Sequence, residues 1–240
     1  MMITGKSVLV TGANRGIGRA LVDEALSRGA ALIYAGTRQP FTHPDARVTP
    51  LTLDVTDAAQ VEAAVGQVGA LDVLINNAGV APYDDLSDAA ALDQALAVNL
   101  LGTHRVTRAF LPVLIKSRGA VVNNVSTMAF APLPLTPAYS VSKAATFSMT
   151  QSLRALLAAQ GVSVHAVLTG PVDTDMTRGF EIPKASAESV ARAVFDGLEH
   201  GEEDIFPDPM SQSVAEDWRG GFAKTLERQY AAIAAEVAAA

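Results

Sequence analysis

A short apolar strand that runs directly into a glycine-rich turn decides the fold of this chain: Ser7-Val8-Leu9-Val10-Thr11-Gly12-Ala13-Asn14-Arg15-Gly16-Ile17-Gly18. The residues that follow predict a helix over Ile17–Arg28. Glycines let a backbone turn tightly and approach a ligand closely, and the first N–H groups of a helix attract anions. The stretch therefore predicts a strand–turn–helix unit that holds a phosphate group.

The rest of the chain repeats this alternation of strand and helix. The strands are predicted at Ser7–Thr11, Ala31–Ala35, Val48–Leu53, Leu71–Asn76, Gly119–Val125 and Val162–Leu168, with a weaker one at Asp204–Phe206. The helices are predicted at Ile17–Arg28, Asp57–Val68, Asp88–Arg118, Pro137–Gln160 and Ala187–His200. Because the strands are apolar on both faces, they are typical of a buried parallel sheet. We expect an α/β fold: a doubly wound, Rossmann-like parallel sheet of about seven strands with helices on both faces.

Length and composition favour one domain over residues 1–240, since 49% of the 240 residues are hydrophobic and no linker or repeat interrupts them. The connection Gln39–Arg47 contains two prolines and has no helical period, so we expect little or no helix there. A helical tail is predicted from about residue 211 to 237, with a break at Gly220-Gly221. The tail carries one apolar stripe, which either packs on its own subunit or contacts another; its members are Phe222, Leu226, Tyr230, Ile233 and Val237.

Charge and residue usage exclude several classes of function. With 18 basic and 25 acidic residues, the formal net charge is 18 − 25 = −7, which argues against a nucleic-acid partner. The chain has no cysteine, so disulfides and thiolate chemistry are excluded. Its four histidines do not have metal-ligand spacing, and no metal site is expected. No apolar run approaches a membrane span and no targeting segment is visible, so a cytoplasmic protein is expected.

Five motifs together resemble the short-chain dehydrogenase/reductase family, in its single-domain branch of about 250 residues. The loop Thr11–Gly18 has the spacing Gly-x3-Gly-x-Gly of the coenzyme loop, and Asn76-Asn77-Ala78-Gly79 is similar to the second signature. Tyr139-Ser140-Val141-Ser142-Lys143 resembles the catalytic Tyr-x-x-x-Lys signature, with Ser126 and Asn99 at the places of two further catalytic residues. The matches follow the family order from Gly5 to Met176.

The cofactor predicted from these residues is NADP(H), with NAD(H) less favoured. The second strand ends in Ala35-Gly36-Thr37-Arg38, with no acid to accept a ribose hydroxyl, whereas Arg38 and Arg15 can pair with a 2′-phosphate. The resemblance implies that Asp54 and Val55 contact the adenine, and that Val172 and Thr174 hold the nicotinamide carboxamide, although Thr169 replaces a usual proline before them. The predicted cofactor-binding residues are Gly12, Asn14, Arg15, Gly16, Ile17, Gly18, Arg38, Asp54, Val55, Asn77, Ala78, Gly79, Tyr139, Lys143, Val172 and Thr174.

The predicted catalytic residues are Ser126, Tyr139, Lys143 and Asn99. Tyr139 and Lys143 are four residues apart and therefore share one helix face. An ammonium favours a phenolate, so Lys143 is expected to lower the pKa of Tyr139 from about 10 and suit it to proton transfer. Ser126 ends a strand and can donate to a carbonyl oxygen, with Thr127 as a rival. The resemblance implies that Asn99 holds a water leading to Lys143.

The function predicted is NADP(H)-dependent interconversion of a ketone or aldehyde and an alcohol. Phe130–Thr136, Val80–Asp85 and a short lid at Thr177–Pro183 are expected to line the substrate side, with Phe130, Leu133, Leu135, Met176 and Phe180 making it apolar and Asp84, Asp85 and Glu181 offering no cation. This favours a neutral, hydrophobic carbonyl substrate. The family implies a homodimer or homotetramer through the helices Asp88–Arg118 and Pro137–Gln160.

Two other functions are alternatives to this prediction. A non-catalytic NADP(H)-binding sensor on the same fold has no need of Ser126, Tyr139 and Lys143 together. A nucleotide-sugar epimerase needs a larger C-terminal substrate domain than the 240 − 176 = 64 residues after Met176 provide.

Overall fold

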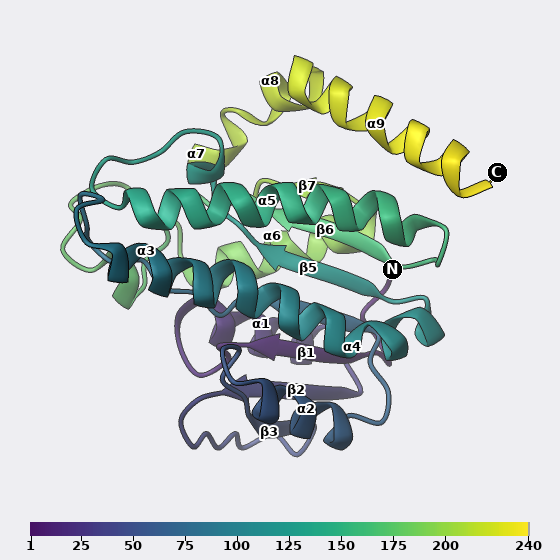
Figure 1. Cartoon of the computed structure of the whole chain (residues 1–240). Coiled ribbons are helices and arrows are strands. Elements are labelled where there is room, and N and C mark those ends of the chain that lie inside the picture. Colours follow the sequence, from purple (N-terminus) through teal and green to yellow (C-terminus); the bar gives the residue numbers. More distant parts are fainter. Residues whose placement is uncertain (240) are drawn as a thin grey trace.

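The computed structural model describes residues 1–239 and shows a seven-stranded, wholly parallel sheet in the order β3-β2-β1-β4-β5-β6-β7 (Figure 1). The predicted doubly wound fold is confirmed, and all seven predicted strands are present. Their bounds are β1 Ser7–Thr11, β2 Leu32–Thr37, β3 Val48–Thr52, β4 Val73–Asn76, β5 Ala120–Asn124, β6 Ser163–Val167 and β7 Asp204–Ile205.

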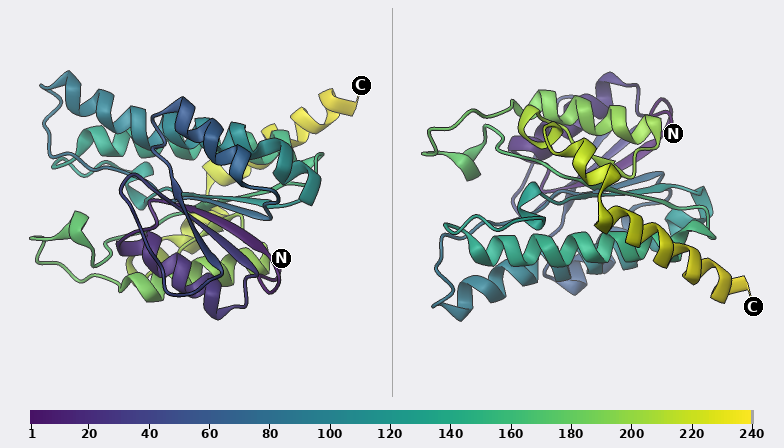
Figure 2. Two further views of the ribbon diagram at one scale, coloured as in Figure 1. Left: turned by 90° about the horizontal axis from the view of Figure 1, so that it is seen from below. Right: turned by 90° about the horizontal axis from the view of Figure 1, so that it is seen from above.

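Helices cover both faces of the sheet, as the apolar strands require (Figure 2). Alternate residues of β1 point to opposite sides: Val8 and Val10 pack with α1 and α6, whereas Leu9 packs with α2, α4 and α5. Period-two alternation with apolar residues on both sides therefore explains the three-layer architecture. The helix bounds in these layers are α1 Gly16–Ser27, α2 Ala58–Gln67, α3 Ala89–Ala95, α4 Thr103–Ser117, α5 Pro137–Ala158 and α6 Ala187–His200.

The order in which strands are added to the sheet changes side between β1 and β4, which are parallel neighbours although two strands separate them in sequence. Chain connections leave β1 toward β2 and β3 on one side, and continue from β4 toward β7 on the other. In such sheets the ligand crevice lies at this switch point, beyond the carboxyl ends of the strands. Thr11, Asn76 and Asn124 end their strands at this edge.

The helix predicted at Asp88–Arg118 is interrupted. A π-helical turn, Leu96–Gly102, joins α3 to α4, and Asn99 lies in it. Gly102 faces Val55 so closely that a Cβ on it would lie 2.6 Å from Val55 Cγ2. Periodicity alone does not show a π-helical insertion, because it adds one residue without ending the helix. The prediction for Gln39–Arg47 is confirmed, since these residues form no helix.

The tail consists of α7 Pro209–Gln212, α8 Ala215–Gly220 and α9 Phe222–Ala239, so the predicted break at Gly220-Gly221 is confirmed. Figure 2 shows the last turns of α9 projecting beyond the rest of the molecule. Of the predicted stripe, Leu226 is half-buried on its own subunit, whereas Phe222, Tyr230 and Ile233 are 81%, 61% and 56% exposed. The side chain of Val237 lies outside the described residues. No described helix is long and apolar enough to cross a membrane.

A buried ion cluster ties this tail to the sheet and to α5. Asp204 of β7 pairs with Arg154 of α5 at 2.8 Å and with Lys224 of α9 at 2.7 Å. Glu227 of α9 pairs with the same two cations, at 3.0 Å from Lys224, and accepts a hydrogen bond from Gln151 at 2.9 Å. The Asp204 and Lys224 side chains are each 3% exposed. Such charges are tolerated away from water only because each has a partner.

This cluster predicts the effect of removing one charge from it. Asp204→Asn should lower the free energy of unfolding by about 3 kcal/mol, the lower end for a broken buried ion pair, because Glu227 still neutralises part of the charge of Arg154 and Lys224. Urea denaturation measures the change. Glu216→Gln, an exposed acid in α8, is the matched control and should change stability by no more than about 0.5 kcal/mol. Equal effects of the two substitutions would show that the cluster does not stabilise the fold.

Candidate active site

The glycine loop is packed so tightly that two of its positions exclude a side chain. A Cβ on Gly18 would lie 2.0 Å from the Gly12 carbonyl oxygen, and Gly12 has a φ of +65° with Ala78 in contact. The loop is also tied to β4: the Thr11 hydroxyl accepts hydrogen bonds from the backbone N–H groups of Asn77 and Ala78 at 2.9 and 3.0 Å. The two predicted cofactor motifs therefore form one rigid unit.

The N-terminus of α1 is left open for an anion. The residue that caps it, Arg15, makes no side-chain hydrogen bond to the first turn, and that turn contains no acid. The loop residues Gly12, Asn14, Arg15, Gly16, Ile17 and Gly18 all border the large cavity described below. Free N–H groups and a positive helix end facing a cavity suit a pyrophosphate, so the residues present fit a dinucleotide.

The two predicted cations both border the cavity but differ in their partners. Arg15 pairs with Asp175 at 3.1 Å, with its side chain 67% exposed. Arg38 is exposed, borders the cavity and has no carboxylate within 4 Å among the described side chains. Asp54 also borders the cavity. Its burial favours a higher pKa, but hydrogen bonds from the N–H and hydroxyl of Thr56, with the charge of Arg38, hold the pKa of its carboxyl below the usual value. Arg38 is therefore the cation left free to meet a phosphate.

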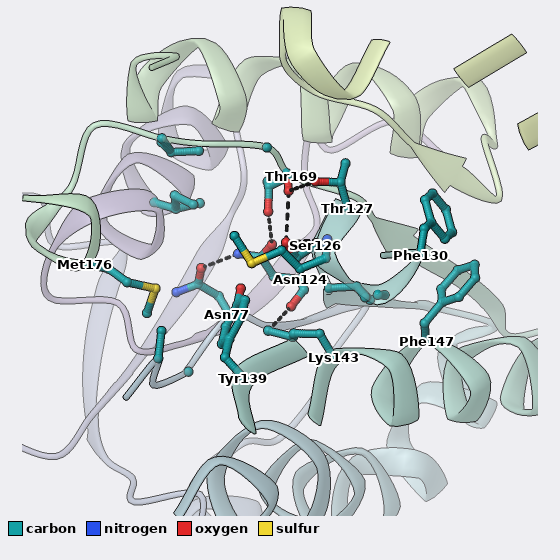
Figure 3. A pocket seen from close by; sticks show the side chains of 18 of the residues that line it. Asn77, Asn124, Ser126, Thr127, Phe130, Tyr139, Lys143, Phe147, Thr169 and Met176 are labelled. Carbon is teal, nitrogen blue, oxygen red and sulfur yellow. Dashed lines mark hydrogen bonds between the residues drawn. The ribbon is translucent and has the colours of Figure 1, made fainter. Parts of the chain in front are cut away.

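Ser126, Tyr139 and Lys143 converge on one wall of the cavity, at the carboxyl ends of β5 and β6 (Figure 3). Ser126 follows β5, and its buried hydroxyl donates to the Thr169 carbonyl at 3.2 Å and accepts from the Met128 N–H at 3.2 Å. Lys143 Nζ donates to the Asn124 carbonyl at 2.6 Å and lies 5.4 Å from the centre of the Tyr139 ring. Thr127, the rival of Ser126, also turns its hydroxyl to the Thr169 carbonyl, at 3.4 Å.

The expected direction of the Tyr139 pKa is wrong for this structure. Burial raises the pKa of Tyr139 to about 12, and the Ser126 hydroxyl opposes this only in part. The same burial lowers the pKa of Lys143 to about 8. Removal of both groups from water favours their neutral forms. The site thus holds a protonated phenol beside an amine that titrates close to neutrality.

Asn99 is buried, and its polar groups have hydrogen-bond partners in the protein. Its amide group makes a pair of 2.9 Å hydrogen bonds with the backbone of Val80 and donates to the Ser142 hydroxyl at 2.8 Å. Its backbone carbonyl oxygen accepts from the hydroxyls of Thr103 and Thr146. Asn99 therefore joins the π-helical turn to α5 and to the loop after β4. The water relay implied for it by the family resemblance stays a prediction.

Asn124 is a site residue that the sequence analysis missed. Its carbonyl holds Lys143, and its amide donates to the Asn77 side chain at 3.0 Å and accepts from the Thr169 hydroxyl at 3.4 Å (Figure 3). It thereby links β5 to the predicted cofactor motif after β4 and to the loop after β6. The feature of the sequence that could have identified it is an asparagine in an apolar strand, two residues before Ser126.

The loop after β6 is anchored in spite of the missing proline. The Gly170 N–H donates to Asp208 at 2.7 Å, and a Cβ on Gly170 would lie 2.6 Å from that carboxylate. The hydroxyls of Thr174 and Thr177 both donate to the Val172 carbonyl. Asp208, which is distant in sequence, supplies rigidity that the loop sequence does not reveal.

One continuous cavity of about 2200 Å³ is lined by the glycine loop and Arg38 and by Ser126, Tyr139 and Lys143. On the substrate side, Phe130, Leu133, Met176 and Phe180 line it as predicted, and so do Val80 and Tyr83. Leu135 does not: it is 53% exposed and borders no part of the cavity in the described chain. Asp84, Asp85 and Glu181 are also outside the lining. The Asp84 carboxylate instead accepts a hydrogen bond from the Ala138 N–H at the start of α5. The tail contributes Trp218 and much of α9, which the sequence analysis did not place there.

A model of the family described as short chain dehydrogenase matches residues 6–184, which span every motif above. The chain belongs to the short chain dehydrogenase family. Within the described residues, no cluster of three or more metal-ligating side chains accompanies the site.

Relatives of this short chain dehydrogenase agree with the assignment. An uncharacterized oxidoreductase of Staphylococcus epidermidis is 33% identical over 208 residues, which cover 80% of this chain and 90% of the relative. The short chain dehydrogenase pigC of Monascus ruber is 32% identical over 78% of this chain and 73% of its own. A solved short chain dehydrogenase of Burkholderia cenocepacia, in complex with NADP, is 35% identical with a TM-score of 0.88, covering 95% and 98% of the two chains.

The buried lysine predicts a pH-dependent stability. The pKa of Lys143 is about 8 in the folded protein and about 10.5 in the unfolded chain, so between these values the unfolded state binds more protons and the wild type gains stability as the pH rises. Lys143→Met removes this dependence. Its free energy of unfolding relative to wild type should therefore fall by roughly 3 kcal/mol between pH 7 and pH 10.5. Urea denaturation across this pH range measures how the free energy of unfolding of each protein changes with pH. If the two proteins showed the same change, the amine of Lys143 would not be buried in its neutral form.

Proposed function

We propose that this short chain dehydrogenase is an NADP(H)-dependent oxidoreductase that interconverts a neutral, hydrophobic ketone or aldehyde and the corresponding alcohol. The observation that carries the proposal is the convergence of Ser126, Tyr139 and Lys143 on one cavity wall, in the same cavity as the open N-terminus of α1. A hydroxyl, a phenol and an amine beside a dinucleotide cradle form the set of groups that carbonyl reduction requires.

Each of the three groups has a distinct task. Bound nicotinamide supplies the hydride. Ser126 donates a hydrogen bond to the carbonyl oxygen, on which negative charge develops. Tyr139 is a protonated phenol at neutral pH and gives its proton to that oxygen. Lys143 is held by the Asn124 carbonyl beside the Tyr139 ring, where its ammonium form assists loss of the phenol proton.

Arg38 supports NADP(H) over NAD(H). It directly follows β2, its charge acts on Asp54, it is free of ion pairs among the described residues, and it has the guanidinium shape that pairs with a phosphate. Arg15 can add to this only in competition with Asp175, its partner in the structure. The NADP complex of the Burkholderia cenocepacia relative, at 35% identity, supports the same choice.

Removal of the Tyr139 hydroxyl tests the mechanism. Tyr139→Phe should lower kcat/KM for ketone reduction by roughly 100- to 10,000-fold, the usual contribution of general acid catalysis, because the developing alkoxide loses its proton donor. NADPH oxidation with a panel of ketones and aldehydes gives the rate. Tyr34→Phe, the same change at a tyrosine packed in the core, is the control and should keep the rate within a few-fold. Full turnover by Tyr139→Phe would refute the mechanism.

The cofactor proposal has its own test. Arg38→Asp should reduce kcat/KM with NADPH by roughly 10- to 100-fold, because a charge-assisted pair is replaced by repulsion, and should raise it with NADH, whose free hydroxyl the new carboxylate can accept. Arg192→Asp makes the same change of charge on α6, away from the cavity, and should leave the preference unaltered. If the wild type uses NADH and NADPH equally well, the role given to Arg38 is wrong.

A further inference from the structure

The cavity does not end at the reaction centre. It continues between α5 and α9, which lie against each other. At about 2200 Å³ it is more than twice the upper size of about 1000 Å³ for sites that take drug-sized ligands. The glycine loop, Arg38 and Asp54 mark the end that fits the dinucleotide. We call the part between α5 and α9 the outer compartment; its lining includes Ser152, Ala155, Leu156, Leu226, Tyr230 and Ala234.

Three aromatic rings form the passage between the reaction centre and the outer compartment. Phe130 stacks on Trp218 with 4.5 Å between ring centres, and Phe147 meets both rings edge-on at 5.4 and 5.3 Å. Figure 3 shows Phe130 and Phe147 on the side of Ser126 and Lys143 opposite to Met176. A substrate whose carbonyl lies at Ser126 and Tyr139 therefore has an aromatic surface on the side that leads toward α9.

The tail side of this passage is fixed in place by the buried ion cluster. Asp204 Oδ2 accepts a hydrogen bond from Trp218 Nε1 at 2.8 Å and pairs with Lys224 at 2.7 Å. Lys224 in turn pairs with Glu227, one residue after Leu226. The side chains that position Trp218 and Leu226 are thus almost inaccessible to water, and the outer compartment has a built wall.

The chemistry of the outer compartment favours an uncharged occupant. Of its charged neighbours, Glu227 is occupied by Arg154 and Lys224, and both cations are themselves paired. The remaining charge in the lining, Asp217, is an exposed acid at the edge. An acidic tail would therefore find no free cation here, whereas methylene groups would be removed from water against Ala155, Leu226 and Tyr230.

We propose that the outer compartment binds the apolar tail of an extended substrate, so that the enzyme acts on long-chain neutral ketones or aldehydes and their alcohols. The inference rests on the proposed function for the position of the carbonyl. Continuity of the outer compartment with the reaction centre is what distinguishes a substrate tail from a partner protein as its occupant.

A series of methyl ketones from 2-butanone to 2-dodecanone tests this proposal. In the wild type, kcat/KM should rise by about fourfold for each methylene that enters the outer compartment, the effect of burying one CH₂. Leu226→Asp should remove most of this rise, because a carboxylate then faces the tail. Ala155→Phe fills the outer compartment without adding charge, so kcat/KM should stop rising at a shorter chain length than in the wild type. This variant keeps the test valid if Leu226→Asp folds poorly.

Ile233→Asp is the matched control, because Ile233 lies on the same helix, is 56% exposed and does not line the cavity. It should leave the chain-length dependence as in the wild type. Equal kcat/KM for short and long ketones in the wild type would overturn the proposal while leaving the proposed function intact. The proposal would also be overturned if kcat/KM still rose with chain length in both Leu226→Asp and Ala155→Phe. In that case, a lower oligomer mass of Leu226→Asp and Ile233→Asp in sedimentation would assign the surface to a second copy of the chain.

Trp218 provides a readout that does not depend on turnover, since it is the one tryptophan in the chain. Titration with 1-decanol, beside ethanol as the short control, should give a saturable change in tryptophan emission with the long alcohol only, and Ala155→Phe should weaken it. If no carbonyl compound is reduced, the proposed function fails, and this titration still decides whether the outer compartment binds an apolar chain. The absence of any emission change with decanol would refute binding at Trp218.

Discussion

Parallel pairing of β1, β4, β5 and β6 brings the carboxyl ends of four strands to one edge of the sheet, and Thr11, Asn77, Asn124, Ser126 and Thr169 lie at or directly after these ends. Thr11 ties the glycine loop to β4, Asn124 ties β5 to Asn77 and Lys143, and Thr169 receives Ser126. Because each strand is buried on both faces, a shift of register would move a whole row of side chains between layers. The same apolar packing that stabilises the sheet therefore aligns the glycine loop with Ser126 and with the proposed proton donor Tyr139.

The active site works against the stability of the fold. Burial of Lys143 and Tyr139 favours the neutral form of each, so the amine comes to titrate near neutrality while the phenol stays protonated. A charge in this position costs stability in the folded protein, and the Asn124 carbonyl offsets only part of the cost. The tail shows the opposite arrangement, since Arg154, Asp204, Lys224 and Glu227 are buried together and neutralise one another. The first set of buried groups is the one that we propose for proton transfer, and the second holds the cavity wall.

Local patterns in the sequence were sufficient for the strands, the layer order and the motif residues, because alternation and glycine spacing act over a few positions. Contacts between distant residues were not predictable in this way. Asp208 supports the loop at Gly170, and Trp218 reaches Phe130, across separations that no period encodes. The π-helical turn at Asn99 was not predicted for a different reason, because it adds a residue within a continuous helix. The direction of the Tyr139 pKa was wrong because spacing gives the distance to Lys143 but not the degree of burial.

Transfer of isotope from the cofactor to the substrate tests the central claim most directly. The enzyme would be supplied with NADPH carrying deuterium on the transferring face of C4 and with a medium-chain methyl ketone, and the alcohol would be analysed by mass spectrometry and NMR. Hydride transfer at the site of Ser126 and Tyr139 predicts one deuterium on the carbinol carbon, in one configuration, while the hydroxyl proton comes from solvent. An alcohol without deuterium on that carbon, or the label in both configurations equally, would contradict it.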